Sequence, residues 1–310
     1  SQRAASSALL TALQSVRSAE GPILVSASEK RRTRAASPLE LTTGDGAATV
    51  LVGEGKPIAH YIGGHSEAVD FVDHFRGEGE AFDYSWEERW VRDEGYMKIV
   101  PNAINNLLDK VGVSAQDIDK FCFPVAMRRA ASGLARKIGI AEESVADNLQ
   151  SRCGETGSAH SLVLLVHALE QAEPGEKILV AGFGQGCDVL LFEATEAIKA
   201  AGDRLAIGEH LARGRAENRY TRYLSFNNLL TMERGIRAEV DKQTGLSTLY
   251  RNKGMSQKLL GGRCSECDTC QFPKSKICVN PDCGAIGSQV DEPFADKAAK
   301  LNSYTADRLT

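Results

Sequence analysis

Five of the eight cysteines fall within twenty residues near the C-terminal end of the 310-residue chain. Tetrahedral zinc takes four thiolate or imidazole ligands, which two closely spaced pairs can supply from two turns. Cys264 and Cys267 form one such pair, and Cys278 and Cys283 form the other. Cys270 is a competing ligand, because it lies at the same two-residue spacing from Cys267. The glycine-rich turn before Cys264 favours the first set, and the cluster predicts a closed, structural zinc site.

Three glycine-rich segments, GDGAA, GETGSAH and GFGQG, lie at the ends of predicted strands. None matches the glycine patterns of phosphate-binding or dinucleotide-binding loops. Glycines at such a turn let a ligand approach the backbone and leave N–H groups to hold an oxyanion. We therefore expect Gly182, Gly184 and Gly186 of GFGQG to line a substrate pocket.

Three further side chains are candidates for catalysis. Glu155 could act as a base at a strand-to-helix turn, or it could be a carboxylate that satisfies free N–H groups at the start of a helix. Cys122 could be a nucleophile if its thiolate is stabilised, or it could be a buried, inert thiol. His160 either lines the site or lies on the plain surface of its helix.

The elements that must position these residues alternate between strand and helix. Helical spacing of apolar residues predicts helices over residues 4–16, 85–110, 126–139 and 157–172. Apolar, β-branched runs predict strands at 21–28, 42–53, 56–64, 118–124, 177–186 and 187–194. Such alternation is typical of a layered α/β domain.

Two local patterns add detail to this prediction. Ser85 and Glu88 have the spacing of a capping box, and Trp86 and Trp90 lie one turn apart, which favours packing in the core. The basic run at 30–34 favours a solvated loop, with an anion site as the alternative.

Composition excludes several classes of protein. Lysine and arginine total 37 against 41 acidic residues, so there is no basic surplus for nucleic acid to bind. No apolar run approaches the roughly 18 residues of a membrane span, and no signal-peptide pattern opens the chain. The clustered cysteines are typical of a metal site in a reducing compartment. We therefore expect a cytoplasmic protein with no membrane partner.

The segments TTGDGAATVLVG and CGETGSAHSLVLLVHALEQAEPGEKILVAGFGQGCDVLLFEA, in this order, resemble the thiolase superfamily. The similarity is to its branch of ketoacyl synthase III and hydroxymethylglutaryl-CoA synthase, over about residues 4–193. From GGRC onward the chain resembles the rubredoxin-like zinc ribbon that precedes an OB-fold in acyl-CoA systems. The resemblance implies a thiolase-like αβαβα domain at 1–194 without its N-terminal part, a helical connector at 195–258, and a zinc ribbon with the start of an OB-fold at 259–310. The chain is therefore expected to be truncated at both ends.

The residues at the family's catalytic positions differ from the usual ones. The nucleophilic cysteine of the family would fall at about Gln2, its histidine at Cys122 and its asparagine at Glu155. Glu155 is then the expected acid–base residue, with Cys122 and His160 as further candidates and the GFGQG turn against the thioester.

The resemblance implies an acyl-CoA-dependent enzyme that makes or breaks a carbon–carbon bond, with coenzyme A as part of the substrate. Thiolase-like acyl transfer and retro-aldol cleavage are both open, and loss of the nucleophile favours cleavage, which needs only a base and an oxyanion hole. The alternative is a non-catalytic acyl-CoA-binding scaffold or substrate-channelling partner. A homodimer is expected, and a further thiolase-like or OB-fold subunit is a second candidate partner.

Overall fold

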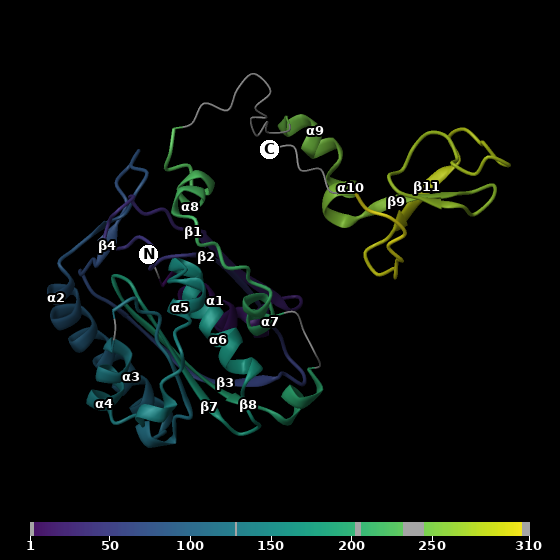
Figure 1. The fold of residues 1–310 in the computed structure, drawn as a ribbon. Coiled ribbons are helices and arrows are strands. Elements are labelled where there is room, and N and C mark those ends of the chain that lie inside the picture. Colours follow the sequence, from purple (N-terminus) through teal and green to yellow (C-terminus); the bar gives the residue numbers. More distant parts are fainter. Residues whose placement is uncertain (1–2, 128, 202–205, 232–244, 306–310) are drawn as a thin grey trace. The chain divides into compact units, whose positions relative to one another are not determined.

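The computed structural model describes residues 3–127, 129–201, 206–231 and 245–305 (Figure 1). Contacts between residues divide the chain into two compact units, Ser1–Met232 and Glu233–Thr310. The first unit holds the layered α/β domain, and the second holds the cysteine cluster. Among the described residues, none of the helices combines the length and the apolar character that crossing a membrane requires.

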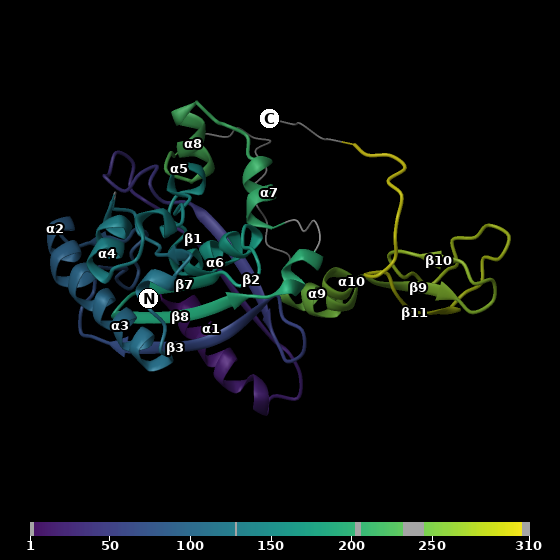
Figure 2. The ribbon, with the colours of Figure 1, turned by 90° about the horizontal axis from the view of Figure 1, so that it is seen from below.

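A four-stranded sheet lies at the centre of the first unit, and Figure 2 shows its long strands side by side. Its order is β3 (Ala59–Ala68), β8 (Gly186–Ala194), β7 (Lys177–Phe183), β6 (Lys120–Cys122). β7 and β8 form an antiparallel hairpin around the GFGQG turn, and β6 pairs with β7 in parallel. Both hairpin strands are buried along nearly their whole length, which explains why their sequences are continuously apolar.

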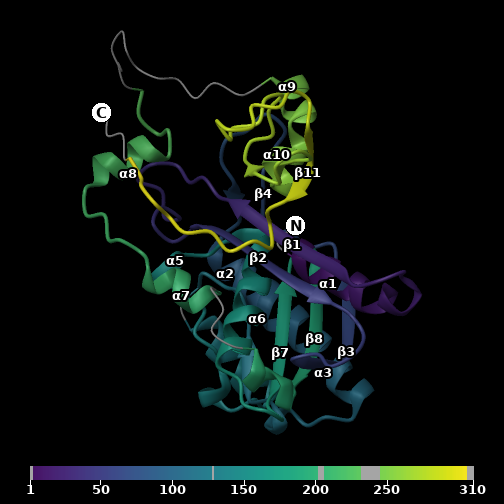
Figure 3. The same cartoon turned by 90° about the vertical axis from the view of Figure 1, so that its right-hand side faces the viewer.

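Helices cover both faces of this sheet. One face packs against α3 (Met97–Val111) and α4 (Ala130–Ile138). The other face packs against α1 (Ala4–Ser15) and α6 (His160–Glu170). A second, two-stranded antiparallel sheet is formed by β1 (Ile23–Lys30) and β2 (Asp45–Val52). It packs on the side of α6 that faces away from the central sheet (Figure 3). The predicted α/β layering is thus confirmed, with four layers in the described residues.

The helix expected at 85–110 begins later than its sequence indicates. Ser85 belongs instead to a short hairpin, which is formed by β4 (His74–Phe75) and β5 (Tyr84–Ser85). α2 (Glu88–Trp90) follows and continues through a π-helical stretch, Val91–Tyr96, into α3. The predicted capping box is therefore wrong, because Ser85 lies in a strand and no side chain caps α2.

The two tryptophans are not core residues. Trp86 is 50% exposed and Trp90 is 48% exposed, and Trp90 stacks on Phe71. Packing on α3 is carried by aliphatic residues such as Ile104 and Leu107 instead.

Two glycine turns, one at Gly44 and one at Gly154, are in backbone contact just before the start of α6. The strand-like segment at Thr43 pairs with Glu155, whose N–H donates to the carbonyl of Thr42 (2.9 Å). The N–H of Gly44 donates back to the carbonyl of Glu155 (3.0 Å). A Cβ at Gly44 would overlap the carbonyl oxygen of Cys153, which ends α5 (Gln150–Cys153). The GDG and GET glycines are therefore required for backbone contact, and this contact fixes the position of Glu155.

Short helices occupy the predicted connector. α7 (Ile207–Ala212) and α8 (Tyr220–Phe226) belong to the first unit, and Tyr220 donates a hydrogen bond to Glu40 (2.9 Å). α9 (Leu246–Arg251) and α10 (Lys253–Lys258) belong to the second unit. Residues 202–205 and 232–244 of the connector lie outside the described residues.

The second unit contains a three-stranded sheet with the order β10 (Cys270–Gln271), β9 (Leu260–Cys264), β11 (Gln289–Pro293). Residues 294–305 contain no helix or strand, and residues 306–310 lie outside the described part of the chain. The start of an OB-fold therefore stays a prediction.

We predict that Gly44→Ala lowers the free energy of unfolding by about 1–3 kcal/mol, because the added methyl group would force the two turns apart. Denaturant unfolding followed by tryptophan fluorescence reports on the first unit, which contains both tryptophans. Gly21→Ala is the control, because a Cβ there meets no atom within 4 Å. Equal stability of the two variants would contradict the interlocked arrangement.

Candidate functional site

A cavity of about 870 Å³ opens in the first unit. It lies between the loop that follows β1, the β4–β5 hairpin and the segment that follows β6. Much of its wall is apolar, from residues that include Leu39, Phe82, Val91, Val125 and Met127. A smaller cavity of about 600 Å³ adjoins it, shares the hairpin as a wall, and reaches the GFGQG turn. Volumes of this size are typical of small-molecule sites.

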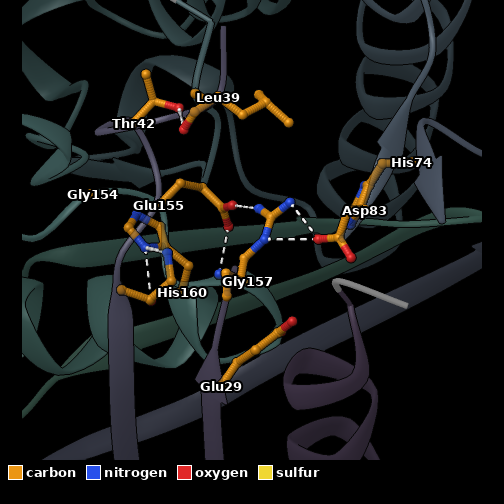
Figure 4. A network of polar contacts seen from close by, with 12 residues as sticks. Glu29, Leu39, Thr42, His74, Asp83, Gly154, Glu155, Gly157 and His160 are labelled. Carbon is orange, nitrogen blue, oxygen red and sulfur yellow. Dashed lines mark hydrogen bonds and ion pairs between the residues drawn. The ribbon is translucent and has the colours of Figure 1, made fainter. Parts of the chain in front are cut away.

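Arg31 lies between the larger cavity and the protein interior, and its side chain is 5% exposed. Its guanidinium forms an ion pair with Glu155 and a second one with Asp83 (3.0 Å), as Figure 4 shows. Arg76 also donates to Asp83 (2.8 Å). The basic run is therefore not a solvated loop throughout: Arg31 is buried, whereas Arg32 is exposed and lines the cavity.

Charge compensation keeps Asp83 ionised. Burial of its carboxylate favours the neutral form, but the hydrogen bond from Arg76 and the charge of Arg31 outweigh that effect and hold the pKa of Asp83 below its usual value. A buried arginine that lost these partners would be an uncompensated charge, which is strongly destabilising. The ion pairs thus join the hairpin to the body of the domain.

Glu155 is buried, and its carboxylate has two named partners. Oε2 pairs with Arg31, and Oε1 accepts a hydrogen bond from the N–H of Gly157 (2.7 Å). Gly157 begins a 3₁₀ turn that leads directly into α6. This geometry matches the alternative in which Glu155 satisfies free N–H groups at a helix start.

His160 lines neither of these two cavities and does not lie on the helix surface. It is buried, its Nδ1 accepts the N–H of Thr156 (3.0 Å), and its Nε2 donates to the carbonyl of Asn148 (2.9 Å). Burial lowers the pKa of His160 to about 4, so the ring is neutral at pH 7. Because both ring nitrogens are already hydrogen-bonded, the catalytic assignment of His160 is corrected: its buried ring links the backbone at Thr156 to the backbone at Asn148.

Cys122 is fully buried in β6 and faces the carbonyl of Leu164 in α6 (3.7 Å). Burial raises the pKa of this thiol to about 12, so it is the inert thiol of the two alternatives. This geometry matches the inert-thiol alternative rather than the nucleophile. The residues that reach the cavity at this strand end are Pro124 and those that follow it.

The three glycines of the GFGQG turn have different surroundings. A Cβ at Gly182 would overlap Ser6 of α1, and one at Gly186 would overlap the carbonyl of Glu67 in β3. Of the three, Gly184 lines the smaller of these two cavities, Gly182 and Gly186 line neither, and the N–H of Gly184 donates to the carbonyl of Gly186 (2.9 Å). The prediction that all three line the pocket is therefore corrected, because two of them allow close packing of α1 and β3.

Three charged residues of the site, Arg31, Asp83 and Glu29, carry no local sequence pattern that marks them as site residues. Arg31 looked like part of a solvated run, and Asp83 lies 52 residues further along the chain. Glu29, at the end of β1, lines the smaller cavity together with Gly184. Of these three residues, only Arg31 lies in a sequence pattern that allowed a site, because the basic run at 30–34 has an anion site as its alternative interpretation.

The four predicted cysteines meet in the second unit. The Sγ atoms of Cys264, Cys267, Cys278 and Cys283 lie within 4.8 Å of one another, whereas Cys270 is exposed. A tetrahedron of thiolates about 2.3 Å from zinc has edges of about 3.8 Å. The Cys264–Cys283 and Cys267–Cys278 separations are 3.9 and 3.5 Å. The donor set therefore fits zinc.

Comparisons with known proteins agree with this division. The family described as the C-terminal domain of 3-oxoacyl-[acyl-carrier-protein] synthase III matches residues 108–190, and the ChsH2 rubredoxin-like zinc ribbon domain matches residues 251–285. The hydroxymethylglutaryl-CoA synthase of Methanopyrus kandleri is 29% identical over 196 residues, which are 62% of this chain and 56% of that protein. That of Methanosphaera stadtmanae is 31% identical over 158 residues, which are 51% of this chain and 45% of that protein.

Solved structures show the same fold. A crystal structure of an HMG-CoA synthase complexed with CoA has a TM-score of 0.61 at 20% identity, covering 78% of this chain and 67% of that chain. The 3-oxoacyl-[acyl-carrier-protein] synthase III of Aquifex aeolicus has a TM-score of 0.55 at 20% identity, covering 62% and 64%. This chain therefore joins a domain with a thiolase-like fold to a segment that matches a rubredoxin-like zinc ribbon. It spans about half the length of the curated relatives that it matches.

We predict that the purified protein contains about one zinc ion per chain, and that Cys278→Ser loses it and unfolds the ribbon. Cys270→Ser is the matched control and keeps the metal, because Cys270 lies outside the group of four. Elemental analysis by mass spectrometry measures both variants. Retention of zinc by Cys278→Ser, or its loss from Cys270→Ser, would contradict the ligand set.

The buried His160 predicts acid sensitivity. Its pKa is about 4 in the folded state and 6.5 as the ordinary value, so the unfolded chain binds the proton first as the pH falls. The resulting contribution to stability is complete above pH 6.5 and falls by about 3 kcal/mol between pH 7 and pH 4. Denaturant unfolding at both pH values should show a smaller loss in His160→Gln than in the wild type. Equal pH dependence in His160→Gln and the wild type would rule out this role.

Proposed function

We propose that the first unit binds an acyl-CoA thioester in the cavity of about 870 Å³, and that the protein makes or breaks a carbon–carbon bond beside the thioester. The observation that carries this proposal is the position of the cavity in a thiolase-like fold. It meets the start of α6 at Glu155, and the adjoining cavity reaches the β7–β8 turn.

The lining of the cavity suits the two chemical parts of coenzyme A. Arg32 and Arg34 supply guanidinium groups at the wall, and Arg34 lies over the ring of Phe82 (5.5 Å). Planar guanidinium groups bind phosphate oxygens in a bidentate manner. The apolar wall from Val125 to Met127 would take the uncharged pantetheine arm and the acyl group.

The direction of the reaction is proposed from the relatives. Those that match are named hydroxymethylglutaryl-CoA synthases, and the structural neighbours include an HMG-CoA synthase complexed with CoA. We therefore propose condensation of acyl groups in preference to retro-aldol cleavage. Zinc, held by the four cysteines, would stabilise the ribbon and take no part in the reaction.

A second candidate function is a non-catalytic scaffold that binds acyl-CoA. The observation that favours it is the state of the three side chains expected to react. Cys122 is buried, both ring nitrogens of His160 are hydrogen-bonded, and Glu155 is ion-paired. Binding and turnover must therefore be measured separately.

We predict that the full chain binds acetoacetyl-CoA in isothermal titration calorimetry, and that Arg32→Ala combined with Arg34→Ala weakens binding about tenfold. Loss of two charge-assisted phosphate contacts at an exposed wall is worth about 1.4 kcal/mol, which is this factor of ten. Arg136→Ala, an exposed arginine on α4, is the control and keeps the wild-type affinity. Absence of binding by the wild type, or an unchanged affinity of the double variant, would contradict the proposal.

Turnover separates the two candidate functions. The wild-type protein is incubated with acetyl-CoA and acetoacetyl-CoA, and products with a new carbon–carbon bond are sought by mass spectrometry. Condensation products support the enzyme. Binding without any product over hours favours the scaffold.

A further inference from the structure

Two carboxylates converge at the start of α6. Glu155 accepts the N–H of Gly157 (2.7 Å), and Glu29 accepts the next one, the N–H of Ser158, through Oε2 (2.6 Å). Gly157 has φ of +59°, and a Cβ at this position would overlap the carboxylate of Glu29. Gly157, which follows the GET turn, therefore allows a carboxylate from a distant strand to reach the 3₁₀ turn that leads into α6. Figure 4 shows both glutamates beside Gly157.

The two carboxylates differ in their charge partners. Glu155 is paired with Arg31, and Asp83 is paired with Arg31 and Arg76. Asp73, which lines both cavities, lies 3.1 Å from the ring of His74. Among the described residues, no Lys, Arg or His nitrogen lies within 4.0 Å of the Glu29 carboxylate. Glu29 is thus the member of this acidic group whose charge no neighbouring cation compensates.

Glu29 also has access to a ligand. Its side chain is partly exposed and lines the smaller cavity together with Gly184 and Gln185 of the β7–β8 turn. The hydrogen bond from Ser158 holds one carboxylate oxygen at the 3₁₀ turn that leads into α6, while the residue lines this cavity. A general base must be positioned in this way within reach of the proton that it abstracts.

We propose that Glu29, and not Glu155, is the catalytic acid–base residue, and that the acyl end of the ligand extends from the larger cavity into the adjoining smaller one, which Glu29 lines; this inference rests on the proposed acyl-CoA function. A carboxylate oxygen of Glu29 takes a proton from the carbon next to the thioester carbonyl. The electron pair of that C–H bond forms the enolate, with the negative charge on the thioester oxygen. The enolate carbon then bonds to the keto carbon of a 3-oxoacyl-CoA acceptor, whose C=O π electrons move to oxygen, and the resulting alkoxide takes the proton back from Glu29 with no leaving group.

The first half of this step is tested by exchange of the acetyl hydrogens of acetyl-CoA in D₂O, followed by mass spectrometry. Glu29→Gln still accepts the N–H of Ser158 but cannot carry a proton. We expect it to lower the exchange rate at least about a hundredfold, while the affinity for acetyl-CoA in calorimetry stays within about twofold. Glu54→Gln, an exposed carboxylate after β2, is the matched control and exchanges as the wild type does.

Glu29→Asp is the second variant, and it tests the same role even if Glu29→Gln does not fold. It keeps the carboxylate but withdraws it by one methylene, so we expect exchange to fall about tenfold or more with binding retained. Wild-type exchange in either variant would overturn the proposal, and so would an equal loss of binding and exchange. Acetyl-CoA that binds the wild type without any exchange would overturn the role of Glu29 alone. Failure of the wild type to bind acyl-CoA would instead contradict the proposed function.

Discussion

The pairing of one buried arginine holds the candidate site together. Arg31 neutralises Glu155 at the GET turn and Asp83 at the β4–β5 hairpin, so it joins three segments that lie far apart in the sequence. A guanidinium at 5% exposure is stable only with such partners, because the cost of removing its charge from water is large. The shape of the larger cavity, which all three segments line, depends on this pairing.

Around this pairing, backbone contacts set the remaining geometry. Gly44 and Gly154 bring two turns together without side chains between them, and Gly157 gives Glu29 access to the start of α6. The N–H groups of Gly157 and Ser158 are therefore each taken by a carboxylate. Glu155 and Glu29 therefore both bind the turn that leads into α6, but within the described residues only Glu155 is also paired with a cation, Arg31. The difference between them is electrostatic and separates a structural carboxylate from a candidate base.

The second unit is organised by a different principle. Its four grouped cysteines lie within twenty residues of one another, so local turns suffice to bring their sulfur atoms together. A closed thiolate site contributes folding free energy to a sheet of only three short strands. The first unit is instead organised by two apolar clusters on the faces of its central sheet.

The sequence alone determined the features that depend on local spacing. The cysteine pairs, the layered α/β class and most strands and helices of the first unit follow from spacing and periodicity, which act over a few residues. Tertiary structure decided the site. Whether Cys122 faces a cavity or a helix depends on which side of β6 the helix α6 covers, and β-strand alternation by itself does not distinguish the two faces. The partners of Arg31 lie 52 and 124 residues away, at positions that only the packing of the turns brings together. For the same reason Gly182 and Gly186, which the sequence predicted to line a pocket, pack against α1 and β3. Glu29, in contrast, lines a cavity that no local sequence pattern indicated.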